Sequence, residues 1–221
     1  MTVVVPKVLQ EWAPPHADWT SGLLLQYGDG YLFALEPHAH WTWEEEGLPR
    51  IRVVGIGGHR APGETWSEAV QREAREEAGV EIALVSSPET DLLGPGDAHR
   101  RMALDWPGHP SPRLVWQATY QFQDRSTGQA ILRTYVGLVF QGRVVRGTPR
   151  PGAEVPGLIL LTGGQLLALA WEARPLHQVV AEGARFLPGT PKVADEALLT
   201  LGGSAQWIAR FLRASASVEQ E

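Results

Sequence analysis

The chain has 221 residues, of which 43% are hydrophobic and 20% are charged, a composition typical of a globular protein that buries a core. It has no cysteine, which excludes disulfides, thiolate metal sites and thiol nucleophiles, and its formal charge of −6 argues against general binding to a nucleic-acid backbone. No run approaches the roughly 20 apolar residues of a membrane span, and the N-terminus lacks a signal-peptide pattern, so we expect a cytoplasmic protein without membrane attachment.

The first third of the chain is predicted to hold an arm, a hairpin, an insertion and a strand. Three prolines make residues 1–19 a loosely structured arm. Two strand-like runs, Ser21–Tyr27 and Tyr31–Leu35, flank a Gly-Asp-Gly turn and predict a β-hairpin. Residues 36–50 resemble an insertion rich in His, Trp and Glu, and the β-rich run Ile51–Ile56 follows it.

The remainder alternates between strands, loops and helices. A helix is predicted from Thr65 to Ala78, and Gly79 ends it in the position where left-handed geometry is usual. Proline, glycine and charge predict a long surface loop over Ser87–Pro112. The other predicted strands are Glu81–Ser86, Arg113–Gln123, Arg133–Val145 and Gly157–Leu161, and the other predicted helices are Gln165–Trp171 and one within Lys192–Ala214. This mixture, with short strand connections, favours the α+β class.

The informative segment is Gly58–Val80. Thr65 followed by Glu68 is a capping-box pattern that starts the helix. At about 100° per residue, one stripe of the helix is apolar, and the opposite sector is an ordinary solvated face. The stripe consists of Trp66, Val70, Ala74 and Ala78, with Ala69 beside it, and the solvated sector of Glu68, Gln71, Arg72 and Arg75.

Three glutamates of this helix stand in an unusual place. Glu73 and Glu77 project into the same sector as the apolar residues, and Glu76 lies at its margin. Carboxylates that lean toward a half-buried edge repel one another and lose solvation. The alternative is a set of surface glutamates that Arg72 and Arg75 neutralise. The position of the glutamates beside the apolar stripe favours the interpretation that a cation or a bound ligand compensates their charge.

The segment resembles the signature box of the Nudix (MutT-like) hydrolases. That box is Gly, five residues, Glu, seven residues, Arg-Glu, an apolar residue, any residue, Glu-Glu, any residue, Gly and an apolar residue. Here it is filled by Gly58, Glu64, Arg72-Glu73-Ala74, Glu76-Glu77 and Gly79-Val80. Seven identities at fixed spacing arise by chance on the order of once in 10⁹ windows.

The resemblance implies an α/β/α sandwich, in which helices flank a mixed sheet, and a metal-dependent pyrophosphohydrolase. Glutamate oxygens suit Mg²⁺ or Mn²⁺, which neutralise a diphosphate and align it for attack by water. By resemblance Glu73, Glu76 and Glu77 are the metal ligands, supported by Glu64, and the backbone carbonyl of Gly57 or Gly58 completes the set. Arg72 orients Glu64 or one of the ligands.

The spacing does not show which group takes the proton from water. In parts of the family the base lies outside the box on a later loop, and Glu154, just before Gly157–Leu161, is the first candidate here. Asp124 and Asp105 are weaker candidates. Glu154 is alternatively a ligand of a second metal or an exposed loop residue, and we favour the base.

The substrate implied by the resemblance is a small nucleoside diphosphate derivative whose identity stays open. Arginine can pair with the phosphates of the substrate and tryptophan can stack on its base. The candidates for substrate recognition are His99, Arg100, Arg101, Trp106 and His109 of the predicted loop, and Trp41 and Trp43 of the insertion. The alternatives are a non-catalytic nucleotide-sensing module of the same fold, which usually has a broken box, and an isomerase of the same fold, which usually has an active-site cysteine.

The chain is divided by prediction into three parts. Residues 1–19 are the arm, residues 20–175 the Nudix-like domain, and residues 176–221 a C-terminal helical extension packed on it. Whether the protein forms a homodimer stays an open question.

Overall fold

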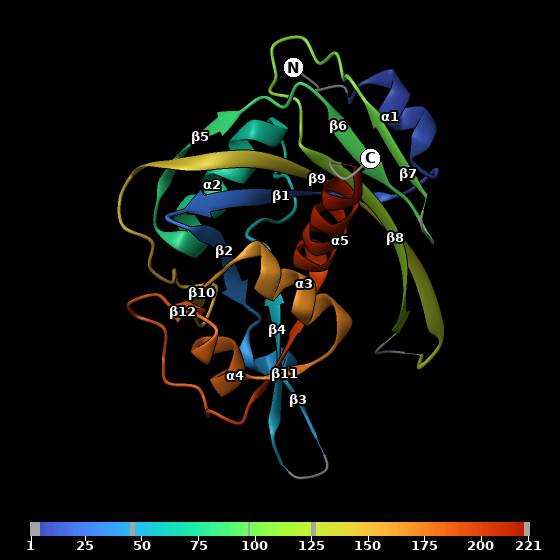
Figure 1. The fold of residues 1–221 in the computed structure, drawn as a ribbon. Coiled ribbons are helices and arrows are strands. Elements are labelled where there is room, and N and C mark those ends of the chain that lie inside the picture. The colour runs from blue at the N-terminus through green and yellow to red at the C-terminus, as the bar shows by residue number, and fades with distance from the viewer. Residues whose placement is uncertain (1–4, 45–46, 97, 125–126, 219–221) are drawn as a thin grey trace.

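The computed structural model describes residues 5–44, 47–96, 98–124 and 127–218, and these form a thirteen-stranded mixed sheet with helices around it (Figure 1). The helices are α1 (Lys7–Trp12), α2 (Trp66–Ala78), α3 (Gly163–Trp171), α4 (Leu176–Ala181), α5 (Gly203–Val218) and the short 3₁₀ helix η1 (His38–His40). The strands are β1 (Asp18–Tyr27), β2 (Gly30–Leu35), β3 (Thr42–Trp43), β4 (Pro49–Val54), β5 (Glu81–Val85), β6 (Thr90–Leu93), β7 (His99–Met102), β8 (Leu114–Gln123), β9 (Ala130–Arg146), β10 (Leu158–Leu161), β11 (Arg174–Pro175), β12 (Arg185–Phe186) and β13 (Leu198–Leu201).

The sheet is mixed because it contains both parallel and antiparallel strand pairs. Its main path runs β11-β13-β4-β2-β1-β9-β8-β6-β7. The parallel pairs are β13 with β4, β1 with β9, and β6 with β8. β9 also pairs with β5, and β10 pairs with β2 and β12. The chain leaves β4 directly into the loop that precedes α2.

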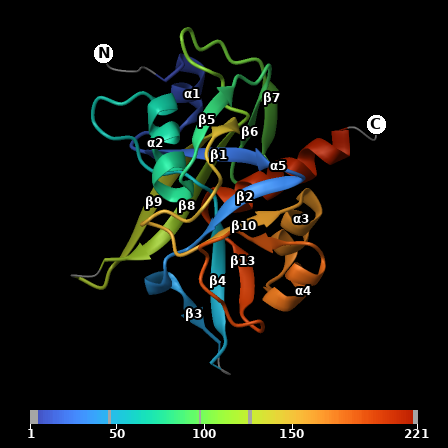
Figure 2. The ribbon, with the colours of Figure 1, turned by 90° about the vertical axis from the view of Figure 1, so that its left-hand side faces the viewer.

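Helices cover both faces of the sheet. Successive residues of a strand point to opposite faces, and those of β2 enter two separate apolar clusters. Phe33 and Leu35 belong to the cluster that includes α3, α4 and α5, whereas Leu32 and Ala34 belong to the cluster that includes α1 and α2. Figure 2 shows the two sets of helices on opposite sides of the strands. The predicted α/β/α arrangement is confirmed.

The predicted hairpin and strands are present. Tyr27 pairs with Gly30 across the β1–β2 turn, and Gly28 has the positive φ of 61° that such a turn requires. The strands predicted after the box are found as β5, β8, β9 and β10, and the one before it as β4. The predicted insertion contains η1 and β3, which pairs with the start of β4.

The N-terminal segment is more ordered than its prolines predict. Residues 7–12 form α1, whose Leu9 is fully buried, and β1 begins at Asp18, inside the predicted arm. Pro6 stands just before the first helical turn, where proline is tolerated. The part of the predicted arm over residues 1–4 lies outside the described residues.

The prediction of a surface loop over Ser87–Pro112 is wrong for its first half. Residues 90–93 form β6, all four of them buried, and β6 pairs in parallel with β8 and antiparallel with β7. The polar composition misled the prediction because Asp91, with no exposed surface, is compensated by Arg101 and Arg113 and also contacts His99. A buried carboxylate is tolerated when it is paired in this way.

The C-terminal segment contributes strands as well as helices. β13 extends the sheet beside β4, and β11, just before the predicted boundary at residue 176, pairs with β13. The extension is therefore not purely helical, and the three-part division of the chain stays a prediction. No helix of the described residues is long and apolar enough to cross a membrane.

Candidate active site

Local hydrogen bonds fix both ends of α2. Thr65 Oγ1 accepts from the Glu68 amide at 3.1 Å, and Glu68 Oε2 accepts from the Thr65 amide at 2.7 Å, which completes the predicted capping box. Gly79 has a left-handed φ of 65°, and its amide donates to the Arg75 carbonyl. The helix therefore begins and ends where the sequence predicts.

The apolar stripe anchors α2 to the sheet. Its members are all buried, as expected: Trp66, Ala69, Val70, Ala74 and Ala78. Glu73 lies in the same sector with only 6% of its surface exposed. Burial is the largest cause of the raised pKa of its carboxyl, which Arg72 opposes. A carboxylate in this position requires positive charge beside it.

Arg72 supplies part of that charge, and it does not lie on a solvated face as its helical position predicted. Its guanidinium donates to Glu64 at 2.8 Å, to Glu73 at 2.9 Å and to Glu76 at 2.6 Å, and also to the His59 carbonyl at 3.0 Å. The planar fork of arginine suits this role. The predicted contact between Arg72 and Glu64 is present.

Glu64 stands apart from the other acidic side chains. One of its oxygens accepts from Arg72 Nε and the other from the Ala61 amide at 2.9 Å. The hydrogen bond from Arg72 is the main cause that lowers the pKa of this carboxyl, and the Ala61 amide is the next. Both oxygens are engaged, and Glu64 therefore positions Arg72; its predicted support of the metal ligands stays a prediction.

Glu154 joins two box glutamates in one acidic group. One oxygen each of Glu73, Glu76 and Glu154 lies within 4.8 Å of the other two. Residues 76 and 154 are far apart in the sequence, so tertiary structure brings them together. The weaker candidates, Asp124 and Asp105, do not belong to this group among the described residues.

The loop after β9 reaches the acidic group because it is built on the C-terminal end of α2. The amides of Arg150 and Gly152 donate to the carbonyls of Ala78 at 3.0 Å and Glu77 at 2.9 Å, which the helix itself cannot satisfy. A Cβ on Gly152 would stand 1.6 Å from the Glu76 carbonyl oxygen, so only glycine allows this approach. These bonds place Glu154 beside Glu76.

Glu77 lies outside the group of three and turns toward the loop before α2. Its Oε2 accepts from the Gly57 amide at 2.9 Å. Burial raises the pKa of its carboxyl to about 8; the Gly57 amide opposes this shift, and the charges of Glu73, Glu154 and Glu76 add to it. Glu73 and Glu76 therefore group with Glu154, and Glu77 lies near enough to interact with their charges while it accepts from Gly57; the metal role of the three box glutamates stays a prediction.

Close packing requires glycine at position 57, just before the box, and at position 58, the first residue of the box. Gly57 has a φ of 143°, and a Cβ there would stand 2.2 Å from the Ser21 carbonyl oxygen. A Cβ on Gly58 would stand 2.5 Å from Glu73 Oε1. The Gly58 carbonyl, predicted as a metal ligand, instead accepts from the Ser21 amide at 2.8 Å and the Ser21 hydroxyl at 3.2 Å. These bonds use both lone pairs of the oxygen and leave Gly57 as the backbone candidate.

A cleft of about 700 Å³ opens beside Glu77. Its walls come from six parts of the chain: β1, the segment after β2, the end of β4 with the glycine loop, α2, the hairpin of β8 and β9, and the start of α5. The lining includes four aromatic side chains that sequence reasoning missed: Trp116, Tyr120, Phe122 and Tyr135. Their alternate spacing along predicted strands was the available signal.

The residues predicted to recognise the substrate lie elsewhere. His99 and Arg101 contact Asp91, and Trp106 is buried against Phe140. None of the seven lines the cleft as the structure describes it; the full set is His99, Arg100, Arg101, Trp106, His109, Trp41 and Trp43. The insertion contributes Glu36 and His40 instead.

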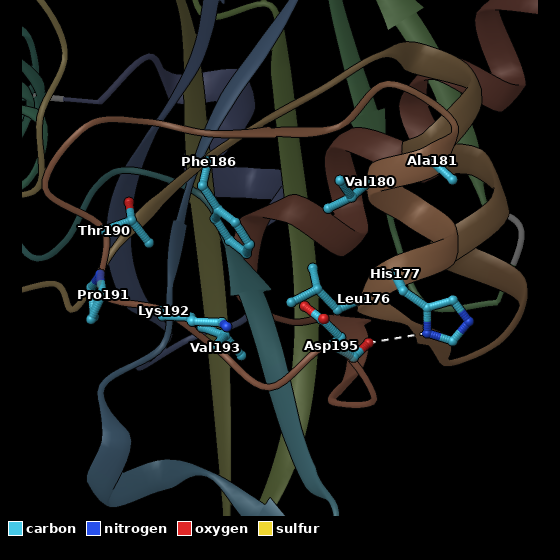
Figure 3. Close-up of a pocket in the computed structure, with 10 residues that line it drawn as sticks. All are labelled: Leu176, His177, Val180, Ala181, Phe186, Thr190, Pro191, Lys192, Val193 and Asp195. Carbon is cyan, nitrogen blue, oxygen red and sulfur yellow. Dashed lines mark hydrogen bonds between the residues drawn. The ribbon is translucent and has the colours of Figure 1, made fainter.

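A second cavity, of about 450 Å³, lies in the C-terminal segment (Figure 3). Its lining includes Leu176 and Val180 of α4 and Phe186 of β12, with Lys192 and Asp195 at its rim. It shares no lining residue with the box or with the larger cleft. Glu77 of the box lines the larger cleft, so the second cavity is separate from the box.

Comparison with known proteins gives fold-level likeness alone. No protein-family model and no curated protein matches the sequence. Similar solved structures include a NUDIX-family hydrolase from Clostridium perfringens, with 17% identity over 68% of this chain and 83% of that one and a TM-score of 0.41. A MutT protein from Methanosarcina mazei Go1 has 13% identity over 69% and 81% of the two chains and a TM-score of 0.42. An ADP-ribose pyrophosphatase from Streptococcus suis 89-1591 has 14% identity over 89% and 90% and a TM-score of 0.34.

The fold of the chain is the one that the resemblance of the box implies. Its own residues agree with this: the signature occupies a loop, a capped helix and a left-handed glycine, and the helix packs on a mixed sheet between two helical layers. Likeness at these identities assigns no activity and no substrate.

Proposed function

We propose that this chain is a metal-dependent pyrophosphohydrolase of the Nudix type, which cleaves the diphosphate bond of a nucleoside-diphosphate-linked substrate by attack of water at phosphorus. The observation that supports it is the acidic group of Glu73, Glu76 and Glu154, whose oxygens lie within 4.8 Å of one another. Arg72 is the ion-pair partner recorded for Glu73 and Glu76. The group thus holds more negative charge than its surroundings neutralise.

The donor set fits a hard divalent cation. Carboxylate oxygens suit Mg²⁺ or Mn²⁺, and burial, with smaller contributions from neighbouring carboxylates, raises the pKa of Glu73 and that of Glu77. Glu73 and Glu76 would hold the cation, with Glu77 and the Gly57 carbonyl next to them, and Glu154 would stand beside it as the base. The bound cation would supply charge neutralisation of the diphosphate and activation of water.

The chain's own groups perform the remaining tasks. Arg72 holds Glu73 and Glu76 in place through one guanidinium and is itself fixed by Glu64. The diphosphate lies between the acidic group and the cleft, so that its leaving groups extend toward the β8–β9 wall. Glu154 takes the proton from the attacking water as a general base. Its proximity to Glu73 and Glu76 supports the base role and a ligand role alike.

Product chromatography tests the proposal directly. Nucleoside diphosphate derivatives are incubated with the protein in Mg²⁺, in Mn²⁺ and in EDTA, and we expect hydrolysis that EDTA abolishes. Glu196→Gln, which changes an exposed carboxylate outside the box, serves as the matched control for box variants. Full turnover in EDTA would exclude the mechanism, and Mg²⁺ binding without turnover of any derivative would favour the non-catalytic module.

Glu154→Gln separates the two roles of Glu154. Loss of a base depresses kcat, most strongly at low pH, and leaves the Mg²⁺ concentration for half activity unchanged. Loss of a ligand raises that Mg²⁺ concentration. We expect the first result, measured as kcat against pH at several Mg²⁺ concentrations, and a shift in Mg²⁺ requirement alone would reassign Glu154 to the metal.

The wider predictions stand as proposals. The intact box gives no support to a sensing module, and the absence of cysteine from the sequence gives none to the isomerase. We also propose a cytoplasmic location and no binding to a nucleic-acid backbone. Whether the protein forms a homodimer stays an open question.

A further inference from the structure

One wall of the cleft beside Glu77 is a row of aromatic side chains. Trp116, Tyr120 and Phe122 stand at even positions of β8 and therefore point to the same face of the sheet. Tyr135 of β9 pairs with Ala118, so its ring lies on that face between the other rings. Ring centroids are 6.0 Å apart for Tyr120 and Tyr135 and 6.2 Å apart for Phe122 and Tyr135.

Helix α5 covers the inner end of this row and leaves the outer end open. Trp116 stacks on Trp207 of α5 with centroids 5.5 Å apart and planes 3° apart. The Trp207 indole also donates to the Tyr120 hydroxyl at 3.4 Å. Beyond this contact Tyr120 and Tyr135 are half-buried, and Phe122 is 43% exposed. The open rings face the same cleft as Glu77.

The facing wall supplies little free positive charge. Its arginine, Arg52, is paired through two nitrogens with both oxygens of Glu36, and Glu36 is buried. A group that enters this part of the cleft therefore meets aromatic faces and a neutralised ion pair. Such surroundings favour a flat, uncharged group over a further phosphate.

We propose that Tyr120, Phe122 and Tyr135 form the stacking subsite for the nucleobase of the substrate. This inference rests on the proposed function, because it assumes that the diphosphate lies at the carboxylates of the box. The cleft volume of about 700 Å³ is within the range of sites that hold a whole small ligand. Stacking on aromatic faces tolerates different bases, so these residues select for the presence of a base.

Calorimetric titration with two non-hydrolysable probes tests the subsite without turnover. The probes are α,β-methylene-ADP and methylenediphosphonate, which share the bridged phosphorus groups and differ in the nucleoside. With Mg²⁺ present, we expect the nucleotide to bind at least about tenfold more tightly. Phe122→Ala should weaken nucleotide binding by about fivefold to a hundredfold, the effect of removing an aromatic partner of a base, and leave methylenediphosphonate binding unchanged.

The same hairpin offers a matched control. Leu132 of β9 pairs with Gln121, points to the opposite face and is 69% exposed, so Leu132→Ala should leave both affinities unchanged. Tyr135→Phe should retain the nucleotide affinity and Tyr135→Ala should lose it, with thermal melts to confirm folding. Because Phe122 is substantially exposed, its variant keeps the test valid if Tyr135→Ala does not fold.

The outcomes distinguish this subsite from the proposed function. Equal affinities for the two probes, or equal losses in Phe122→Ala and Leu132→Ala, would overturn the subsite even if Mg²⁺-dependent hydrolysis is found. Nucleotide affinity that depends on Phe122, in a protein that hydrolyses no diphosphate derivative, would uphold the subsite and overturn the hydrolase.

Discussion

Two groups of carboxylates in this protein, each with one buried member, differ in the positive charge around them. Asp91 of β6 has no exposed surface, and it contacts His99 at 2.6 Å, Arg101 at 2.9 Å and Arg113 at 3.1 Å. In the acidic group, Glu73, Glu76 and Glu154 lie together, and Glu73 and Glu76 form ion pairs with Arg72. The first group is compensated by the protein, whereas the second is not.

The comparison shows how charge balance separates a structural cluster from a metal centre. A buried carboxylate with sufficient cationic partners is complete and contributes to folding. Glu73 and Glu76 share one guanidinium, and beside them burial, with smaller contributions from the charges of Glu73, Glu154 and Glu76, raises the pKa of Glu77 to about 8. A bound cation would neutralise these carboxylates and so stabilise the arrangement. The following predictions test this difference.

The largest effect is expected from the box. Glu73→Gln should lower kcat by at least about a hundredfold at saturating Mg²⁺, the scale seen when a preorganised electrostatic element is removed. Steady-state kinetics on the substrate found in the screen measures it, with Glu196→Gln as control. Near-normal turnover would show that the site has been misplaced.

The next effect concerns Asp91 and should appear in stability instead of catalysis. Asp91→Asn removes the charge that pairs with Arg101 and Arg113, and we expect a loss of about 3 kcal/mol in the free energy of unfolding, the lower end for a broken buried pair because these arginines partly reach solvent. Denaturant titration measures the loss. Asp29→Asn, which breaks an exposed pair with Arg185, should change stability by under about 1 kcal/mol.

Asp91→Asn should also leave kcat unchanged well below its melting temperature. A loss of kcat without a loss of stability would reverse the assignment of the two groups.

The smallest effect is a gain in stability without metal. Because the folded-state pKa of Glu77 is raised from 4.5 to about 8, the folded protein retains a proton between these pH values that the unfolded chain has released. The stability of the metal-free protein should therefore fall as pH rises through this range. Glu77→Gln should raise the melting temperature in EDTA, and more at pH 8 than at pH 5, with its amide oxygen still able to accept from Gly57.

Added Mg²⁺ should reverse the advantage of Glu77→Gln, since the cation stabilises the wild-type carboxylate. A melting temperature that is unaffected at every pH would show that Glu77 is not strained, and Glu196→Gln controls for the loss of one charge.

The box helix could be predicted almost completely because its determinants are local. Thr65 and Glu68 cap each other, Gly79 ends the helix, and the spacing of Val70, Ala74 and Ala78 sets the buried stripe. The same rotation places Glu73 beside that stripe. These features depend on hydrogen bonds and periodicity within a few turns, which the sequence encodes directly.

Tertiary structure decided the features that join distant segments. Glu154 reaches Glu73 and Glu76 because Arg150 and Gly152 bind the carbonyls that end α2, and Arg72 turns inward because Glu64 and the His59 carbonyl accept from it. Strand β6 exists because β7 and β8 pair with it and compensate Asp91. The solvent exposure of the Tyr120 and Phe122 rings depends on how far α5 extends over the sheet. Each of these depends on pairing between chain segments far apart in the sequence, which local patterns do not specify.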